Sequence, residues 1–203
     1  MDGYVQLDEI SMDILKEIGN VGTGNAVTSL SRMMEQPIEL DLPSLKVVKY
    51  YKMHELLEQP EELQTGILIE VTGQLKGIFL FMLSEAFTKT VINTILGEEE
   101  RNLTSLDDME CSLISELGNI MCGSYIRALS QLMDMDMDVS VPELCIDMGG
   151  AILSVPLSRF LRVSDDILMI DNLFHLGGES FLGRILFIPE PDSLDMMLRS
   201  LRE

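Results

Sequence analysis

An internal repeat with a period of 99 residues is the feature that most constrains the fold of this chain. Residues 14–25 read ILKEIGNVGTGN and residues 113–124 read LISELGNIMCGS. The shift superposes several identical residues, namely Glu17 on Glu116, Gly19 on Gly118, Asn20 on Asn119, Gly24 on Gly123 and Pro43 on Pro142. It also places Asp13 on Ser112. Self-similarity at a fixed period indicates two copies of one supersecondary unit.

Each copy is predicted to run from a long helix through β-strands to a short helix. In the first half we expect the long helix at 8–33, strands at 67–71 and 77–83, and the short helix at 84–96. In the second half we expect Thr104 or Ser105 to cap the long helix, strands at 167–170 and 184–188, and the short helix at 192–201. Residues 38–43 and 137–142 alternate apolar and polar, as half-buried strands do. A longer connection through residues 175–178 predicts that the 99-residue register slips there.

The chain length and the repeat together predict one α+β domain, spanning residues 1–203. A chain of 203 residues suffices for one sizeable domain or for two fused half-domains. The two repeats, approximately 1–100 and 101–203, meet in the polar segment 97–102. Neither repeat need bury both faces of its sheet alone. We therefore expect two halves that are related by a pseudo-twofold axis and share one β-sheet core.

The repeated helices are predicted to carry a polar stripe beside a buried one. The buried stripes are expected to contain Ile10, Ile14, Ile18 and Val21 in the first helix, and Met109, Leu113, Leu117 and Ile120 in the second. The polar stripes contain Asp13, Glu17 and Asn20, and Ser112, Glu116 and Asn119. One such stripe is typical of a solvated helix face, but both copies keep Glu, Gly and Asn at the same offsets. Gly and Asn are poor helix formers. Close packing of a neighbouring backbone is a second explanation of the glycines.

The charge balance excludes whole classes of partner. A net charge of −20 repels nucleic acid and anionic lipid, because binding either requires Lys and Arg. The first residues lack the basic stretch and apolar run of a secretion signal, and no apolar run approaches the roughly 20 residues of a membrane span. The three cysteines show no C-x-x-C spacing, which is typical of reduced thiols. We expect a cytoplasmic protein with no nucleic-acid partner and no membrane insertion.

Conventional catalytic and metal motifs are poorly matched. The two histidines, His54 and His175, have no metal-ligand spacing with the cysteines. A Ser-His-Asp site remains open, although the G-x-S-x-G motif is absent. The glycines of residues 19–24 do not form a phosphate-binding P-loop. The alternating acids Asp134, Asp136 and Asp138 begin like a calcium loop, but Val139 stands where its glycine belongs. We expect these acids to face solvent and no metal to be bound.

At the repeated motif the chain resembles the CheC family of bacterial chemotaxis phosphatases, with CheX and FliY as relatives. The family pattern is Asp or Ser, three residues, Glu, two residues, Asn, then 22 residues and Pro. Both copies fit it, with Asp13, Glu17, Asn20 and Pro43 in the first and Ser112, Glu116, Asn119 and Pro142 in the second. CheX-like proteins carry one such motif, and FliY continues into a flagellar-switch domain that this chain lacks. CheC is the best match.

The resemblance implies a phosphatase that hydrolyses the aspartyl phosphate of the response regulator CheY. In such a reaction the regulator supplies Mg²⁺ and a lysine, so the resemblance implies no cofactor of the chain's own. Carried onto this sequence, Asn20 and Asn119 would hold the attacking water, while Glu17 and Glu116 would pair with the regulator's lysine. Asn is not a credible general base, so this would be catalysis by positioning.

The resemblance also implies an alternative role, as an adaptor that binds and regulates the receptor deamidase CheD with little or no catalysis. The expected surface lies in the second half, away from the motif helices. Asp147, Gly149 and Gly150 are the candidate contact residues. A strand followed by a tight turn is the structural alternative for the same stretch.

Overall fold

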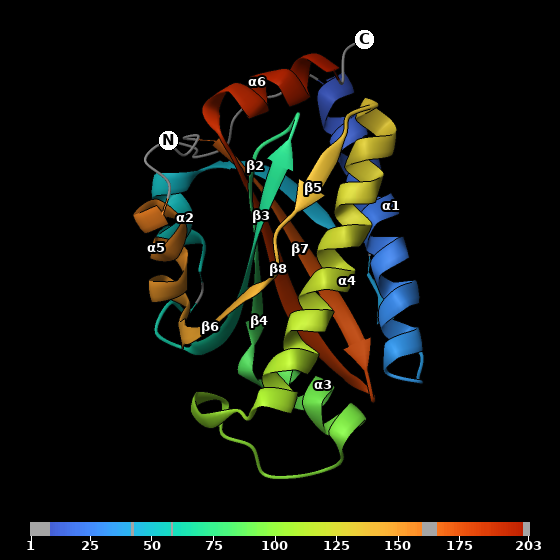
Figure 1. The fold of residues 1–203 in the computed structure, drawn as a ribbon, viewed down its shortest axis with the longest axis vertical. Coiled ribbons are helices and arrows are strands. Elements are labelled where there is room, and N and C mark those ends of the chain that lie inside the picture. The colour runs from blue at the N-terminus through green and yellow to red at the C-terminus, as the bar shows by residue number, and fades with distance from the viewer. Residues whose placement is uncertain (1–8, 42, 58, 160–165, 201–203) are drawn as a thin grey trace.

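The chain passes through the same order of elements twice, as the computed structural model shows for residues 9–41, 43–57, 59–159 and 166–200 (Figure 1). The first half contains α1 (Glu9–Met33), β1 (Glu39–Leu40), β2 (Ser44–Lys49), a 3₁₀ turn (Tyr50–Lys52), α2 (Met53–Leu56), β3 (Leu63–Gly73), β4 (Gly77–Ser84) and α3 (Glu85–Leu96). A 3₁₀ turn (Leu103–Ser105) leads into the second half, which contains α4 (Asp108–Met133), β5 (Met137–Val139), β6 (Glu143–Met148), α5 (Gly149–Arg159), β7 (Asp166–Leu176), β8 (Glu179–Pro189) and α6 (Pro191–Ser200).

The strands form a single antiparallel sheet of eight strands to which both halves contribute. Its order is β1-β7-β8-β4-β3-β5, with β2 also paired to β7 and β6 also paired to β3. The centre of the sheet is the β4–β8 pair, one strand from each half. On either side of that pair, β1 and β2 extend β7 as β5 and β6 extend β3. This arrangement confirms the predicted α+β class, in which pseudo-twofold-related halves share one sheet.

The register of the repeat slips by four residues, earlier in the chain than predicted. Ser44 pairs with Asp171, and the equivalent pair in the other half is Glu143 with Leu68. The β2 and β6 partners are thus 99 residues apart, whereas the β3 and β7 partners are 103 apart. The slip lies in the segment containing α5, which is longer than its counterpart. The predicted long connection at 175–178 is wrong, because β7 and β8 form a hairpin whose Gly177 and Gly178 both have positive φ angles.

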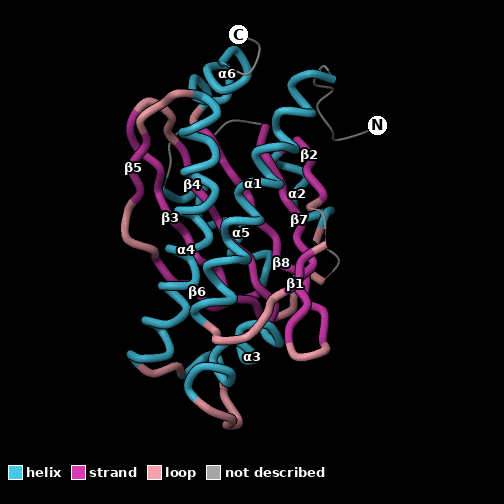
Figure 2. The backbone as a smooth tube through the Cα atoms, turned by 90° about the vertical axis from the view of Figure 1, so that its right-hand side faces the viewer, coloured by secondary structure: helices cyan, strands magenta, loops and turns pink. Residues whose placement is uncertain are grey.

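Helices cover both faces of the sheet. In Figures 1 and 2, α1 and α4 lie side by side on one face, while α2 and α5 lie on the other. Side chains of β4 alternate between the two layers, since Phe79 and Phe81 pack under α1 and α4 while Leu80 and Met82 pack toward α2 and α5. The strand is therefore buried on both faces, which explains its continuous apolar sequence. Within the described segments, no helix is long and apolar enough to cross a membrane.

The buried face of each motif helix is rotated relative to the prediction. Ile18 and Leu117 are buried as expected, and three further predicted residues, Ile14, Leu113 and Ile120, are half-buried against the core. Val21, however, is 38% exposed and Met109 is 65% exposed, and the side chain of Ile10 lies outside the described residues. The core side of α1 is instead formed by Leu15, Ile18, Gly22 and Ala26. At 100° per residue, this side is roughly opposite the Asp13–Asn20 stripe rather than beside it. Val21 belongs to the apolar arc that the sequence predicted to be buried. The helix packs through the neighbouring arc that contains Leu15 and Ala26, so Val21 stays exposed.

The start of α4 also differs from the prediction. Its N-cap is Asp107, not Thr104 or Ser105, which belong to the preceding 3₁₀ turn. The Asp107 side chain accepts a hydrogen bond from the Glu110 amide, and the Glu110 side chain accepts one from the Asp107 amide, which makes a capping box. The predicted helix start at residue 8 and helix end at residue 201 lie outside the described residues, as does the side chain of His54.

Candidate functional site

The repeat places two equivalent groups of polar side chains on the outer faces of α1 and α4. The N-terminal motif site consists of Asp13, Glu17, Asn20 and Pro43. The C-terminal motif site consists of Ser112, Glu116, Asn119 and Pro142. All six side chains on the helices are exposed, Pro43 is half-buried and Pro142 is buried. The three helix residues of each site thus lie together on an accessible helix face, while Pro43 and Pro142 lie in the segments that follow β1 and β5.

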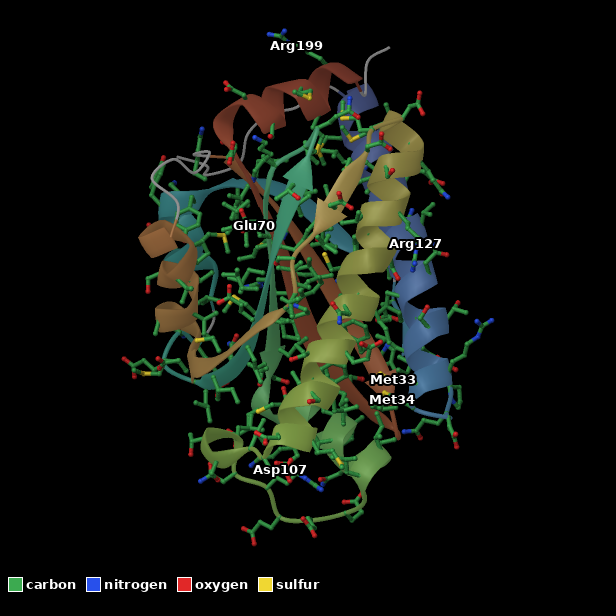
Figure 3. All side chains as sticks on the ribbon, viewed as in Figure 1. Met33, Met34, Glu70, Asp107, Arg127 and Arg199 are labelled. Carbon is green, nitrogen blue, oxygen red and sulfur yellow. The ribbon has the colours of Figure 1, made fainter. Side chains whose placement is uncertain are left out.

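The two motif sites lie toward opposite ends of the helix pair. Helices α1 and α4 run antiparallel. The C-terminal end of α1, at Met33, therefore lies toward the same end of the helix pair as Asp107, which precedes α4 (Figure 3). Each motif occupies the N-terminal half of its helix. The two motif sites are therefore separate rather than parts of one composite site.

Two of the glycines in the motif helices are required by packing. A Cβ on Gly22 would lie 2.6 Å from Cδ1 of Tyr125, and a Cβ on Gly118 would lie 2.5 Å from Cγ2 of Ile67. The first contact joins α1 to α4, and the second joins α4 to the sheet. Gly24 and Gly123 differ, since a Cβ on either would meet nothing within 4 Å. Close packing therefore explains Gly22 and Gly118, and it leaves the exposed Asn residues unexplained.

At the N-terminal motif site, Asn20 lines a pocket of about 240 Å³ between α1 and the segment that joins β1 to β2. The other lining residues are Thr23, Gly24, Val27, Leu40, Asp41 and Pro43. Pro43 reaches this place because it packs near Gly19, whose Cβ would lie 3.8 Å from the Pro43 Cγ. Lys16 forms an exposed ion pair with Asp13, at 3.2 Å from Nζ to Oδ1. Within the described part of the chain, the side chains of Glu17 and Asn20 have no hydrogen-bond or ion-pair partner.

At the C-terminal motif site, the two key side chains contact each other. Asn119 Nδ2 donates a hydrogen bond to Glu116 Oε2 at 3.3 Å. The Ser112 hydroxyl donates to the Asp108 carbonyl oxygen at 2.7 Å, so it is turned back onto its own helix. At the other site, the interaction of Asp13 with the described residues is made through Oδ1, with Lys16. The two motif sites therefore share their backbone geometry but differ in the partners of their side chains.

The chemistry available at these faces is recognition and positioning. An exposed carboxylate with an amide one turn away can pair with a cation and hold a water molecule, since an amide both donates and accepts hydrogen bonds. Among the residues that the structure describes, no cluster of His, Cys, Asp and Glu could hold a metal ion. Asp134, Asp136 and Asp138 are exposed, as predicted. Burial raises the pKa of the Cys122 thiol to about 12, so this thiol is a neutral core group rather than a nucleophile.

The sequence did not reveal that Asp41 and His175 belong beside the N-terminal motif site. His175 Nε2 lies 3.2 Å from Asp41 Oδ1, and His175 Nδ1 lies 2.8 Å from Ser180 Oγ. His175 reaches Asp41 because β1 pairs with β7, with Glu39 opposite His175. The two residues are 134 positions apart, so only the strand pairing, which no local pattern encodes, brings them together.

The candidate CheD-contact residues lie at the junction of β6 and α5. Asp147 is exposed, and its Oδ1 accepts the Met148 amide at 2.7 Å. The amides of Gly149 and Gly150 donate to the carbonyl oxygens of Glu62 and Pro60. Of the structural alternative for this stretch, the strand is confirmed as β6, whereas the tight turn is wrong because the glycines begin helix α5 directly after the strand. This helix lies on the face of the sheet opposite α1 and α4 (Figure 1).

Comparisons with known proteins agree with the motif. The model of the CheC-like family matches residues 10–45 and 109–146, the two motif helices and the strands that follow them. The CheY-P phosphatase CheC of Bacillus subtilis (strain 168) is 27% identical over 199 residues, which cover 96% of this chain and 95% of that protein. The CheY-P phosphatase CheX of Thermotoga maritima is 30% identical over 117 residues, which cover 55% of this chain and 72% of that protein.

The fold has a counterpart among solved structures. The crystal structure of Thermotoga maritima FliY superposes with a TM-score of 0.75 over 98% of both chains, at 22% identity. At this identity the likeness concerns the fold alone. Taken with the two matched motif segments and with the identity to CheX, it leads to one conclusion: the chain belongs to the CheC-like family.

Proposed function

We propose that this chain is a CheY-P phosphatase, which hydrolyses the aspartyl phosphate of the response regulator CheY. The observation that carries the proposal is the exposed Glu-x-x-Asn face that occurs on both α1 and α4 of a CheC-like chain. Its relatives CheC and CheX are named CheY-P phosphatases. Such a partner acts inside the cell, so the proposal also assigns the chain to the cytoplasm.

The role that we assign to Asn20 and Asn119 is to hold the attacking water in line with the phosphorus–oxygen bond that breaks. Hydrolysis of an acyl phosphate depends mainly on positioning and on compensation of phosphoryl charge. An amide can accept one water hydrogen and orient the oxygen lone pair toward phosphorus, but it cannot remove a proton. The exposure of both Asn side chains supports this role, since the partner's phosphoryl group must come within hydrogen-bond reach.

The role that we assign to Glu17 and Glu116 is to pair with the lysine of the regulator's active site. Glu at i and Asn at i+3 project from one helix face toward one partner site. The Mg²⁺ that neutralises the phosphoryl oxygens belongs to the regulator in this proposal, so the chain needs no metal of its own. Glu116 must release Asn119 when the partner binds, and the single exposed hydrogen bond at 3.3 Å makes that release inexpensive.

We also propose CheD binding as a second role, at Asp147 and the start of α5. Asp147 is exposed at the end of an edge strand. Helix α5 lies on the face of the sheet opposite the motif helices (Figure 1), so both partners could bind at once.

The test of the proposed function is the rate at which phosphorylated CheY loses phosphate in Mg²⁺. We expect the wild-type chain to accelerate the loss, either single variant (Asn20→Ala or Asn119→Ala) to retain activity, and the double variant to lose it. Asn25→Ala is the matched control, because Asn25 is an exposed Asn on α1 outside the motif. Unfolding curves must show that the double variant is folded. Full activity in the folded double variant would refute the mechanism.

A further inference from the structure

The two motif sites differ in one charged side chain that neither motif contains. Asp41 lines the pocket beside Asn20, and its carboxylate is held by His175 of β7, which is in turn hydrogen-bonded to Ser180 of β8. His175 Nε2 lies 3.2 Å from Asp41 Oδ1 and faces the carboxylate. On the other side of the ring, His175 Nδ1 lies 2.8 Å from Ser180 Oγ, and this hydrogen bond fixes the orientation of the imidazole.

The backbone around Asp41 is equivalent to the backbone around Ser140 in the other half. The Asp41 amide donates to the Leu173 carbonyl oxygen at 3.1 Å, and the Ser140 amide donates to the Glu70 carbonyl oxygen at 2.9 Å. Ser140 follows Asp41 by 99 residues, and Leu173 follows Glu70 by 103, which are the two shifts of the repeat. The position beside the motif Asn is thus an acid in the first half and a serine in the second.

The Ser140 hydroxyl is engaged by the backbone of its own chain rather than presented to a partner protein. The Ser140 hydroxyl accepts the Glu70 amide at 3.0 Å and donates to the Val141 carbonyl oxygen at 3.0 Å. The position equivalent to His175 is Thr72, which is neutral and directly precedes Gly73 at the end of β3. The C-terminal motif site therefore has neither the acid nor the residue that holds it.

We propose that Asp41, held by His175, is a specificity-determining residue that makes the N-terminal motif site the one of higher affinity, by pairing with a basic side chain of the phosphorylated partner. The inference rests on the proposed function. Asp41 is 63% exposed and has a second carboxylate oxygen beyond the one that faces His175, so a Lys or Arg of the partner can reach it. His175 acts through Asp41 and is a positioning residue. A fixed carboxylate loses less conformational freedom when the partner binds than a mobile one does.

The experiment measures KM and kcat for dephosphorylation of phosphorylated CheY in two single-site backgrounds. Asn119→Ala leaves the N-terminal motif site, and Asn20→Ala leaves the C-terminal one. In the first background Asp41→Ser, which installs the residue of the other half, should raise KM about two- to fivefold and weaken its salt dependence, with kcat nearly unchanged. In the second background the same change should have no effect.

His175 and a matched acid complete the design. His175→Leu should raise KM in the first background, and His175→Gln, which keeps a donor, should restore part of the affinity. Glu179→Gln removes an exposed charge from the same hairpin, on the opposite face of the strand from Ser180, and should change nothing.

The outcomes separate the inference from the proposed function. If the wild-type chain does not accelerate the loss of phosphate from CheY, the proposed function is refuted. If the wild type is active but the Asn119→Ala background is not, or if Asp41→Ser changes neither KM nor its salt dependence there, the inference is wrong and the function stands. An equal change of KM in both backgrounds also overturns the inference, because it indicates a general effect of charge.

Discussion

Asn119 and Glu116 are hydrogen-bonded to each other on the surface of α4, whereas their counterparts Asn20 and Glu17 have no such bond on α1 within the described residues. The repeat therefore supplies two copies of one motif that differ in the hydrogen bonding of their side chains. In the C-terminal copy the amide is already oriented by its carboxylate, and in the N-terminal copy it is free to turn toward the pocket that it lines.

The charge of Glu116 can be tested apart from its hydrogen bond. Glu116→Gln keeps an oxygen that accepts from Asn119 but removes the charge that would pair with the partner's lysine. In the Asn20→Ala background we expect KM for phosphorylated CheY to rise about two- to fivefold, with a smaller change in kcat. Glu100→Gln, at an exposed acid outside both motifs, is the control. A lower kcat at unchanged KM would instead assign Glu116 to the chemical step.

The glycines of α1 provide a paired test of packing. Gly22→Ala should destabilise the fold by about 1–3 kcal/mol, because the new Cβ would lie 2.6 Å from the Tyr125 ring. Gly24→Ala, two residues away with nothing within 4 Å, should stabilise it by up to about 1 kcal/mol through helix propensity. Free energies of unfolding from urea titrations measure both. Equal effects of the two substitutions would show that the ring contact carries no weight.

Local sequence patterns predicted the helices and strands, whereas the way these pack together depends on the strand pairing in the sheet. The repeat and the strand alternation were enough to predict α1, β3, β4, α3 and a fold of two halves around one sheet. Helix α5 was missed because it begins with Gly149 and Gly150, two poor helix formers whose amides are satisfied by the backbone of residues 60–62. The buried faces of α1 and α4 were misplaced because both helices are apolar over more than one arc, and contact with Tyr125 and Ile67 selects among the arcs.

The site was predictable only where the motif repeats. Glu17, Asn20 and their counterparts stand out because one spacing occurs twice. Asp41 and His175 carry no such signal, since a lone acid and a lone histidine far apart in sequence become neighbours only through the pairing of β1 with β7.

Alkaline pH should destabilise the fold through its buried acids. Burial raises the pKa of Cys122 from 9.0 to about 12 and that of Tyr125 from 10.0 to about 12, the latter against the lowering effect of hydrogen bonds with Thr23 and Asn172. Between pH 9 and 12 the unfolded chain therefore loses protons that the folded chain keeps, so the free energy of unfolding falls as pH rises. Urea titrations at several pH values should show this fall.

The matched variant for the pH dependence is Cys122→Ala. Its free energy of unfolding should be lower at pH 8, because a buried side chain is shortened, but it should fall less steeply above pH 9. Alkylation of Cys122 should also require unfolding. An unchanged slope in the variant would mean that the Cys122 thiol does not contribute to the alkaline loss of stability.

CheD binding can be tested at the exposed end of β6. Asp147→Lys reverses the charge at the proposed contact and should weaken binding of CheD at least tenfold in a titration by calorimetry, while dephosphorylation of CheY continues. Its Oδ1 bonds only locally, to the adjacent Met148 amide, so the fold should tolerate the change. Asp138→Lys, at an exposed acid on neighbouring β5, is the control. Binding that survives Asp147→Lys would exclude this surface.

A buried polar cluster joins the two motif helices to the sheet and offers the last test. The hydroxyls of Thr23 of α1 and Tyr125 of α4 lie within hydrogen-bonding distance of each other and of Oδ1 of Asn172 on β7, which is 3.1 Å from Thr23 Oγ1 and 3.4 Å from the Tyr125 hydroxyl. Since each hydroxyl has one hydrogen, one of them donates to the other and the second donates to Asn172 Oδ1. All three residues are at least nine-tenths buried. Thr23→Val and Tyr125→Phe should each cost about 1–3 kcal/mol, since each leaves a buried polar partner less satisfied.

The double variant should cost less than the two single costs added together. Thr23 and Tyr125 share one hydrogen bond and one acceptor. The first substitution already removes a hydrogen-bond partner of the second hydroxyl, so removing that hydroxyl as well costs less than removing it from the wild type. We expect a coupling free energy of about 0.5–1.5 kcal/mol in a double-mutant cycle followed by urea unfolding. Thr28→Val, at an exposed threonine of α1 that bonds only to the Gly24 carbonyl oxygen, should show no coupling to Tyr125→Phe. Strict additivity of Thr23→Val and Tyr125→Phe would mean that the cluster does not link the two motif helices.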